Sequence, residues 1–555
     1  MPPQGMMPQG QPGQPMPQGQ MPPQGMMPQG QPRPQGQPGQ PQMGQYPMMQ
    51  MQLPTEPDSA ILALTARPVS GSSRKGKNPV LFLVGDSTMR TGTRGNGDNG
   101  QWGWGYYAHQ WFDEDRITVE NHALGGLSIR TFYRGWWPDV LKGIQKGDYV
   151  IIELGHNDSG PYDSPFGRSS IPGTGKDSVL VAQRDGSQEA VLSFGEYLRR
   201  FVSEIRAKGA KPIFFTLTPR NQWEPDGSVR RKNDSYNIWI REIAKEKKVP
   251  VVDLEDISAR DFESWSHFKV DYMFYNDNIH SSAFGAAHNA WCAAQGIAAC
   301  TQSDLLKYLK PLELPSLDLD RTDGKPALIV TGDSTIQNTD SDPDGMWGWG
   351  SVLETVFDPE RIQLVNAGKA GRSARTFLDE GRWDRVYNSI KPGDFVVIQF
   401  GHNDMGQPNR MPFRAELAGN ANETDNLFMP DKRNYQVIYS YGWYLRKFID
   451  DVREKGGTPI LVSLTPRNIW QDGKMENRDD SFGIWVRDVV RQTGVDFVDM
   501  HNITAAYYNT IGPEATNAYY KNDHTHTSRL GAERNAKSFA EGLKEMNHPL
   551  AKYLK

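Results

Sequence analysis

Residues 81–88 read Leu-Phe-Leu-Val-Gly-Asp-Ser-Thr, so four apolar residues run directly into Gly-Asp-Ser-Thr. Such an apolar run predicts a buried strand of a parallel sheet that ends at a turn. Gly85 lets the chain bend there, and we expect Ser87 at the carboxyl end of the strand, at the start of the next helix. Open α/β sheets bind their ligands at that edge. The phrase returns at residues 328–335 with Ser334 in the place of Ser87, and the chain is organised around these two serines.

Strands and helices alternate along the chain from about residue 78. Candidate strands are residues 80–84, 117–120, 149–154, 212–217 and 249–253, and candidate helices are residues 194–205, 236–247, with Asp234-Ser235 as its cap, and 285–295. This alternation predicts an α/β fold, a parallel sheet covered by helices on both faces. The polar span from Gly160 to Ser193 is long for a connection, and we expect a loop over the site there.

The second half of the chain repeats the first about 246 residues later. The repeated phrases are Trp-Gly-Trp-Gly at 102–105 and 347–350, Gly-His-Asn-Asp at 155–158 and 401–404, Thr-Pro-Arg at 218–220 and 465–467, and the segments 277–280 and 523–526. A repeat of this length predicts two whole domains rather than a solenoid of short units. We place them at residues 78–315 and 316–555, after a low-complexity tail at 1–54 and a linker at 55–77.

The tail consists almost entirely of Pro, Gln, Gly and Met. It has almost nothing to bury, which predicts a disordered or partly polyproline-II segment. It is either a solvated spacer or a tether that docks elsewhere.

Composition excludes some classes of protein. The chain of 555 residues has a formal net charge of −5, which gives no sign of nucleic-acid binding. No apolar stretch approaches the roughly 18 residues needed for a transmembrane segment, and no signal peptide is visible at the start of this sequence. The two cysteines, Cys292 and Cys300, are expected either to pair or to be lone buried thiols. A zinc site needs about four ligands, so we do not expect one from these two cysteines.

Hydrolysis by a serine needs a base, a group that orients the base, and hydrogen-bond donors for the oxyanion. Ser87 is the candidate nucleophile and His280 the candidate base. Asp277 can reach the imidazole Nδ1 of His280 and leave Nε2 for the serine; the alternative is a capping aspartate beside a surface histidine. The N–H groups of Ser87 and Gly126 and the Asn157 amide are candidate oxyanion donors, with a plain turn at Gly126 and an Asx-turn at Asn157 as alternatives.

These residues fall in four blocks that resemble those of the SGNH, or GDSL, hydrolase superfamily. In the first copy the blocks are Gly85-Asp86-Ser87, Gly126, Gly155-His156-Asn157-Asp158 and Asp277-Asn278-Ile279-His280; in the second their key residues are Ser334, Gly371, Asn403, Asp523 and His526. The nearest subfamily looks like the rhamnogalacturonan acetylesterases. The cues are Gly-Asp-Ser-Thr, Gly-His-Asn-Asp, and Asn-Ala-Gly-Lys-Ala-Gly-Arg-Ser at 366–373.

The resemblance implies two tandem flavodoxin-like three-layer domains, each a serine esterase that needs no metal or other cofactor. It implies an acetylated pectic polysaccharide or oligosaccharide as substrate, deacetylated through an acyl-enzyme intermediate, and a secreted or periplasmic location. The first copy departs from the pattern at Leu127, where the second has Arg372. This departure leaves the four catalytic groups untouched and concerns only the substrate of the first domain.

Five further side chains are candidates for binding sugar. Trp104 and Trp349 are expected either to stack on sugar rings or to pack in the core. Arg220 and Arg467 end equivalent strands, where they would hold a uronate carboxylate or form a structural ion pair. Arg372 follows the oxyanion glycine of the second copy, so we expect it to contact a substrate uronate, the alternative being an ion pair with a protein carboxylate.

Three other functions stay open. The protein could deacylate another glycan such as xylan, or hydrolyse a lipid or thioester, although the polar segments rich in Trp and Arg argue against the apolar channel that a long acyl chain needs. One domain could be an inactive copy that only binds polysaccharide, although neither copy lacks a catalytic group. An adhesion or scaffold role would rest on the tail alone.

Overall fold

The computed structural model describes residues 55–64, 67–164, 167–231, 235–321, 324–339, 341–342, 344–476 and 481–555. The tail at 1–54 and the proposed cap residue Asp234 lie outside these residues. The described residues form one compact unit that holds both parallel sheets. The boundary that we place between residues 315 and 316 stays a prediction.

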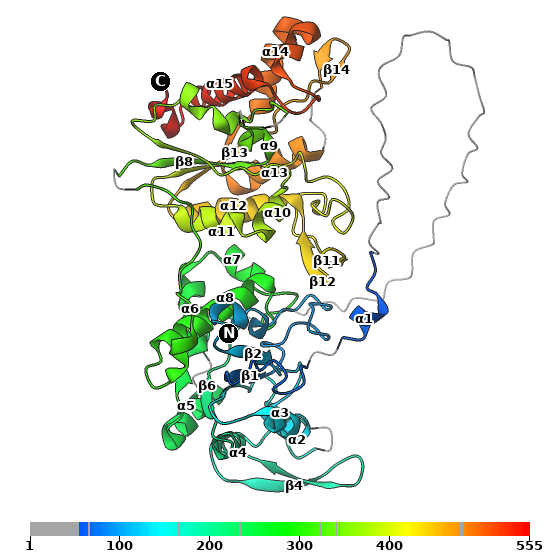
Figure 1. Ribbon diagram of the computed structural model, residues 1–555, viewed down its shortest axis with the longest axis vertical. Coiled ribbons are helices and arrows are strands. Elements are labelled where there is room, and N and C mark those ends of the chain that lie inside the picture. Colours follow the sequence, from blue (N-terminus) through cyan, green and yellow to red (C-terminus); the bar gives the residue numbers. More distant parts are fainter. Residues whose placement is uncertain are drawn as a thin grey trace, which may run out of the picture. The chain divides into compact units, whose positions relative to one another are not determined.

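The first sheet has five parallel strands in the order β2-β1-β3-β6-β7 (Figure 1). Its strands are β1 (Val80–Gly85), β2 (Thr118–Asn121), β3 (Tyr149–Glu153), β6 (Lys211–Phe215) and β7 (Val251–Val252). In the register of the sheet, Leu81 lies opposite Val119 of β2 and Tyr149 of β3. The order is that of a doubly wound flavodoxin-like fold, so the carboxyl end of β1 is the edge where a ligand site is expected.

Helices cover both faces of this sheet. Phe82 packs against one group of helices, α2 (Ile129–Gly135), α3 (Trp137–Gly143), α4 (Phe194–Ala207) and α5 (Tyr236–Lys247). Leu81, which points to the other face, packs against α6 (Leu254–Ser264) and α8 (Ala283–Ala299); α7 (His267–Tyr272) lies between these two in the chain. The predicted three layers are confirmed, and the helix expected at 236–247 has those bounds.

The second sheet repeats the first. It runs β9-β8-β10-β13-β16 and consists of β8 (Ala327–Gly332), β9 (Gln363–Asn366), β10 (Phe395–Gln399), β13 (Thr458–Val462) and β16 (Asp496–Val498). The helices are α9 (Ser334–Gln337), α10 (Ala374–Asp379), α11 (Arg382–Ser389), α12 (Tyr441–Glu454), α13 (Ser481–Thr493), α14 (Met500–Thr516) and α15 (Arg529–Glu545). The prediction of two α/β domains is therefore confirmed.

A β-hairpin occupies part of the span for which we expected only a loop. Strands β4 (Ser178–Ala182) and β5 (Gln188–Leu192) pair in antiparallel fashion. Val181, Val191 and Leu192 are buried in it. The short apolar runs at 179–182 and 190–192 were hidden by the Gly, Ser and Pro around them, in a span read as loop. The second domain has the equivalent hairpin β11 (Thr424–Met429) and β12 (Asn434–Tyr439), and a short one, β14 (Trp470–Gln471) and β15 (Lys474–Met475).

The end of the predicted linker is bound to the first sheet. The linker contains the single turn α1 (Ser59–Leu62). Further on, Arg74 donates two hydrogen bonds of 2.7 Å to the buried carboxylate of Asp148, which also accepts the N–H of Val80 at 2.9 Å. Arg321 binds Asp394 in the same way, with two bonds of 2.9 Å. The same arginine–aspartate pair thus fixes the start of the first strand in both domains.

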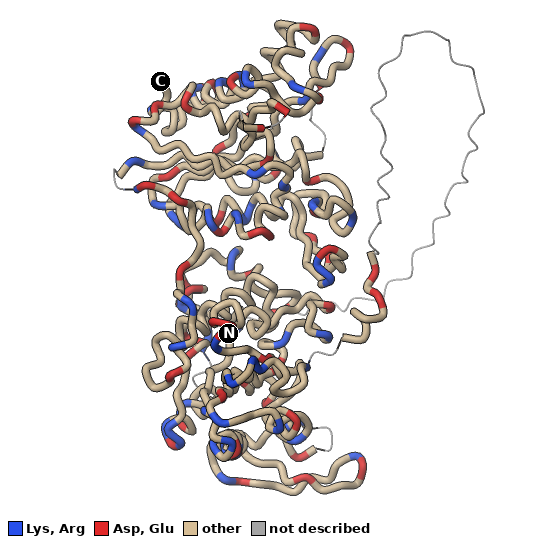
Figure 2. Tube along the Cα trace, viewed as in Figure 1, with Lys and Arg blue, Asp and Glu red and all other residues tan. Residues whose placement is uncertain are grey.

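Acidic and basic residues alternate along the described chain (Figure 2). Within the described residues, no helix combines the length and the apolar character that a bilayer crossing requires.

Candidate active site

Ser87 and His280 meet at the carboxyl end of β1. Ser87 Oγ lies 2.9 Å from His280 Nε2, and His280 Nδ1 lies 2.6 Å from Asp277 Oδ2. The other oxygen of Asp277 accepts the backbone N–H groups of Ile279 and His280, at 2.8 and 2.7 Å. The aspartate is therefore fixed by its own loop, and it favours the imidazole tautomer whose Nε2 can accept the serine proton.

The second copy has the same geometry. Ser334 Oγ lies 2.8 Å from His526 Nε2, and His526 Nδ1 lies 2.6 Å from Asp523 Oδ2. Asp523 Oδ1 accepts the N–H groups of Thr525 and His526, each at 2.7 Å. Both copies therefore hold a serine, a base and an orienting carboxylate within hydrogen-bond reach of one another.

A buried aspartate before each serine holds the turn after the first strand. Asp86 Oδ1 accepts both the N–H and the hydroxyl of Thr88 at 3.0 Å, and Asp333 binds Thr335 in the same way at 2.9 and 2.8 Å. Burial raises the pKa of Asp333 to about 6 and that of Asp86 above its usual range. The hydrogen bonds between the aspartate and the threonine of Gly-Asp-Ser-Thr thus fix the turn and orient the serine that lies between them.

Gly126 and Asn157 line the same cavity as Ser87 and His280. Gly126 has a φ of +75°, a conformation that favours glycine. Asn157 Nδ2 donates to the Leu127 carbonyl at 3.2 Å; this bond fixes the side chain and leaves the second N–H of the amide for another acceptor. In the second domain Gly371 has a φ of +76°, and Asn403 Nδ2 binds the Arg372 carbonyl at 3.2 Å. Both positions fit donors to an oxyanion.

The partly buried carboxylates of the two sites stay ionised. Burial acts to raise the pKa of Asp277, but the hydrogen bonds from His280 and from the Ile279 N–H outweigh it and hold that pKa below its usual value. The same balance lowers the pKa of Asp523. An ionised aspartate can stabilise the imidazolium that forms when the histidine takes the serine proton.

A second carboxyl group follows each candidate oxyanion asparagine, Asn157 and Asn403. Asp158 accepts the N–H of Ile129 at 3.0 Å and the hydroxyl of Ser170 at 2.9 Å, and burial raises its pKa to about 7. Asp404 accepts the equivalent N–H of Ala374 at 2.9 Å, but the second domain has Glu416 where the first has Ser170. Burial raises the pKa of both Asp404 and Glu416. Asp404 Oδ2 and both carboxylate oxygens of Glu416 have no hydrogen-bond partner among the described residues, so we expect this pair to hold a proton.

The first site opens into a cavity of about 600 Å³ that two arginines not predicted from the sequence line. Arg90 and Arg168 line it together with Leu127 and Trp136. Arg90 Nε donates to the Gly92 carbonyl at 2.8 Å, and Arg168 Nη1 to the Gly126 carbonyl at 2.9 Å. Both guanidinium groups are thus held by carbonyls, which leave their charge in place. The signal for Arg90 was its position three residues after Ser87; Arg168 lies in the polar span that we treated as loop.

Trp104 and Trp349 are core residues, which corrects the expectation that they stack on sugar. They are 1% and 0% exposed. The indole N–H of Trp104 donates to Glu153 at 2.6 Å, and that of Trp349 to Gln399 at 2.9 Å. Their ring faces and their indole N–H groups therefore make contacts inside the domains and are not exposed to a sugar.

Arg372 is paired with a protein carboxylate, which corrects the expectation of a uronate contact. Its Nε lies 3.0 and 3.1 Å from the two oxygens of Glu380, and its Nη1 donates to the Ala370 carbonyl at 3.0 Å. Of the alternatives that the sequence left open, the structure has the ion pair.

Arg220 lies near the first catalytic set. Burial lowers the pKa of Arg220, while the charges of Asp86 and Asp277 act in the opposite direction. The Nε atoms of Arg220 and Arg467 have no hydrogen-bond partner among the described residues, and neither forms the structural ion pair that was the alternative in that part of the chain. Their role in holding a uronate stays a prediction.

The histidine of each Gly-His-Asn-Asp phrase is structural. His156 Nε2 lies 3.2 Å from Thr218 Oγ1, and His402 Nε2 lies 3.1 Å from Thr465 Oγ1, so each histidine joins two neighbouring strand ends. Cys292 and Cys300 are both free thiols, which decides against a disulfide between them.

The two halves of the chain that carry the repeated motifs each match a known protein family. The family described as "GDSL-like Lipase/Acylhydrolase family" matches residues 83–288 and 330–534. A probable rhamnogalacturonan acetylesterase of Bacillus subtilis is 30% identical over 228 residues, which are 40% of this chain and 94% of the relative. A rhamnogalacturonan acetylesterase of Emericella nidulans is 29% identical over 235 residues, which are 42% of this chain and 91% of the relative. Among solved structures, an acetyl xylan esterase from Geobacillus stearothermophilus is 22% identical with a TM-score of 0.28, over 40% of this chain and 95% of that one, a likeness too low to bear on substrate.

Proposed function

Since the chain belongs to the GDSL-like lipase/acylhydrolase family, we propose that it is a serine esterase that removes O-acetyl groups from a pectic polysaccharide of the rhamnogalacturonan type. The observation that carries the proposal is the hydrogen-bonded line from Ser87 through His280 to Asp277, repeated in the second domain. We propose that both domains are active.

The geometry supports a reaction in two steps. Ser87 Oγ attacks the carbonyl carbon of the acetyl group while His280 Nε2 takes the serine proton. The oxyanion that forms is bound by the N–H groups of Ser87 and Gly126 and by the amide of Asn157; one such donor lowers the barrier by about 3 kcal/mol. The bond to the sugar oxygen then breaks, that oxygen takes the proton from His280, and acetyl-Ser87 remains. Water attacks this ester with the same base, and acetate leaves.

The pectic substrate is supported by two observations. The relatives that match over one domain are named for rhamnogalacturonan acetylesterases. In addition, Arg90 and Arg168 line the first cavity, and a guanidinium suits the carboxylate of a uronate residue. Xylan lacks a uronate in its backbone, so the alternative substrate predicts no use for these cations.

Release of acetate tests the proposal directly. The full chain would be assayed on acetylated rhamnogalacturonan, acetylated homogalacturonan and acetylated xylan at equal acetyl concentration. We expect the highest kcat/KM on rhamnogalacturonan. A higher kcat/KM on xylan would replace the pectic assignment with the xylan alternative, and turnover of long-chain acyl esters alone would contradict both.

A further inference from the structure

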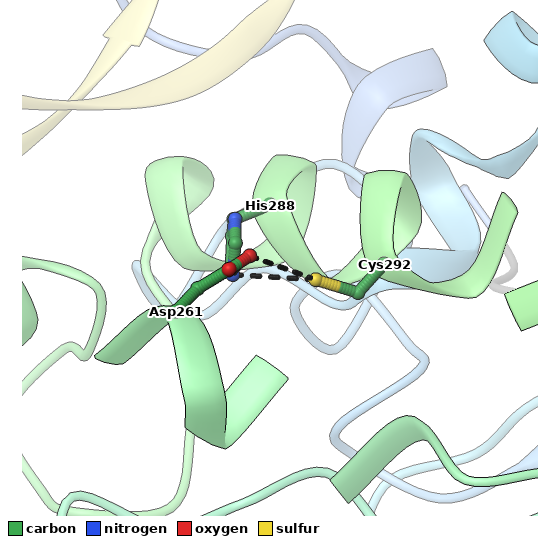
Figure 3. A group of neighbouring side chains, drawn as sticks. All are labelled: Asp261, His288 and Cys292. Carbon is green, nitrogen blue, oxygen red and sulfur yellow. Dashed lines mark hydrogen bonds and ion pairs between the residues drawn. The ribbon is translucent and has the colours of Figure 1, made fainter. Parts of the chain in front are cut away.

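Three side chains outside both catalytic sets meet between α6 and α8 of the first domain (Figure 3). Asp261 comes from α6, and His288 and Cys292 lie one turn apart on α8. Cys292 Sγ lies 3.3 Å from His288 Nε2 and 3.7 Å from Asp261 Oδ2, and the last two atoms are 3.5 Å apart. Sulfur, imidazole nitrogen and carboxylate oxygen are the ligand atoms that zinc takes in proteins.

The three separations match the edges of a ligand tetrahedron. With Zn–S near 2.3 Å and Zn–N and Zn–O near 2.0–2.1 Å, tetrahedral angles place neighbouring ligand atoms about 3.3–3.6 Å apart. The observed separations of 3.3, 3.5 and 3.7 Å lie within about 0.2 Å of these values. A cation could therefore be bound with almost no rearrangement of the side chains, and a fourth position would remain for water.

The surroundings of the cluster fit a bound cation. Cys292 is fully buried, whereas the side chains of His288 and Asp261 are 10% and 41% exposed, so a cation can enter along the aspartate. The nearby ammonium of Lys269 is itself paired with Glu454 at 2.7 Å.

In the second domain, an arginine side chain supplies a positive charge at one of the three equivalent positions. About 246 residues on, α14 and α15 carry Tyr507, Arg534 and Ser538 in place of the aspartate, histidine and cysteine. Arg534 Nη2 donates to Ser538 Oγ at 2.9 Å, and the guanidinium lies 4.8 Å from the centre of the Tyr507 ring. The three helix positions thus pack together in both domains, and the first domain has metal-ligand side chains where the second has an arginine.

We propose that Asp261, His288 and Cys292 bind a zinc-type divalent cation that joins α6 to α8. Binding forms a metal–thiolate bond and releases the Cys292 proton to solvent, so affinity falls as the pH falls. The site uses none of the groups assigned to ester hydrolysis. The two cysteines taken as a pair do not indicate this site; the spacing of His288 and Cys292 at i and i+4 was the available signal.

Cobalt(II) tests the site in the full chain, because a thiolate ligand gives it a charge-transfer band in the near ultraviolet. Since the chain has only two cysteines, Cys300→Ser is a matched control for Cys292→Ser. We expect one equivalent of Co²⁺ to produce the band in the wild type and in Cys300→Ser, and Zn²⁺ to displace it. Absence of the band in the wild type, or its persistence in Cys292→Ser, would overturn the proposal.

A second variant is needed because Cys292→Ser also changes the packing of a buried side chain. Asp261→Asn changes only the partly exposed ligand, and we expect it to weaken Zn²⁺ binding at least 10-fold and to abolish the rise in Tm that Zn²⁺ gives the wild type. Unchanged affinity in this variant would contradict the assigned ligand set. Turnover of a small acetyl ester should persist in Asp261→Asn and after chelation with EDTA, so failure of the metal site and failure of the esterase proposal are distinguishable.

Discussion

Arg372 is bound to Glu380, with its Nε 3.0 and 3.1 Å from the two carboxylate oxygens. Glu380 also binds Arg382 at 2.6 Å, so one carboxylate holds two guanidinium groups. The charge that distinguishes the second copy from Leu127 of the first is therefore engaged within the domain. A difference in substrate between the domains has to come from other residues.

Arg372→Leu should leave the substrate preference of the second domain almost unchanged. We expect less than a threefold change in the ratio of kcat/KM for substrates with free and with methyl-esterified uronate, measured in a Ser87→Ala background. The stability cost should be at most about 1 kcal/mol, because the pair is partly exposed. A 10-fold fall in that ratio would show that Arg372 leaves Glu380 to bind substrate.

Arg90→Gln should remove a uronate preference from the first domain. Glutamine is the natural residue at the equivalent position, Gln337, so the change transplants the second site's chemistry. A lost charge-assisted hydrogen bond of about 1.5–3 kcal/mol corresponds to a fall of about 10- to 100-fold in kcat/KM for the free uronate. The measurement is made in a Ser334→Ala background, with Arg90→Lys as the control that keeps the charge. Equal losses on free and esterified substrate would mean that Arg90 only supports the loop.

The buried acid pair predicts a dependence of stability on pH. The pKa of Glu416 is raised in the folded chain, so its contribution to stability is present in full below the unfolded value of 4.5 and is lost as the pH rises through the folded pKa. For each proton that the folded chain keeps and the unfolded chain has lost, the free energy of unfolding falls by about 1.4 kcal/mol per pH unit in that window.

Glu416→Ser, which introduces the residue of the first domain, should therefore flatten the fall in stability as the pH rises above 4.5. Urea unfolding at several pH values measures it. Glu423→Ser changes an exposed carboxylate and is the control. An unchanged slope in Glu416→Ser would mean that the pair does not hold the extra proton.

Asp277→Asn should reduce turnover by the first domain by about 10⁴-fold in a Ser334→Ala background, because an amide cannot stabilise the imidazolium and favours the wrong tautomer. Asp271→Asn, which changes an aspartate of the neighbouring α7, should have little effect. Acetate release from a small ester measures both. If Asp277→Asn kept a tenth of the activity, the base would be oriented by another group.

The fold could be predicted because its signals are local and repeated. The apolar run before Ser87 and the copy of it before Ser334 indicated buried strands, and the alternation of strands and helices left only a doubly wound sheet. The hairpin β4–β5 was missed because its apolar residues form two short runs, at 179–182 and 190–192, in a span rich in Gly, Ser and Pro that reads as loop.

The catalytic candidates were easier to predict than the substrate contacts. Asp277 and His280 are close in the chain, and Ser87 follows a strand whose end fixes its position, so sequence order constrains all three. Burial of Trp104 and the pairing of Arg372 with Glu380 depend on which helix packs on which strand. No local pattern distinguishes such side chains from ones that face a ligand.

The two nucleophiles give the most direct test that both domains are esterases. Ser87→Ala, Ser334→Ala and the double variant would be assayed for acetate release from a small acetyl ester, with folding checked by thermal unfolding. Each single variant should keep part of the wild-type kcat/KM, and the double variant should lose at least 10³-fold, since one complete set of nucleophile and base remains in each single variant and none in the double. Loss of all turnover in one single variant would contradict the claim that the other domain is an enzyme in its own right, and full activity in the double variant would contradict the serine mechanism itself.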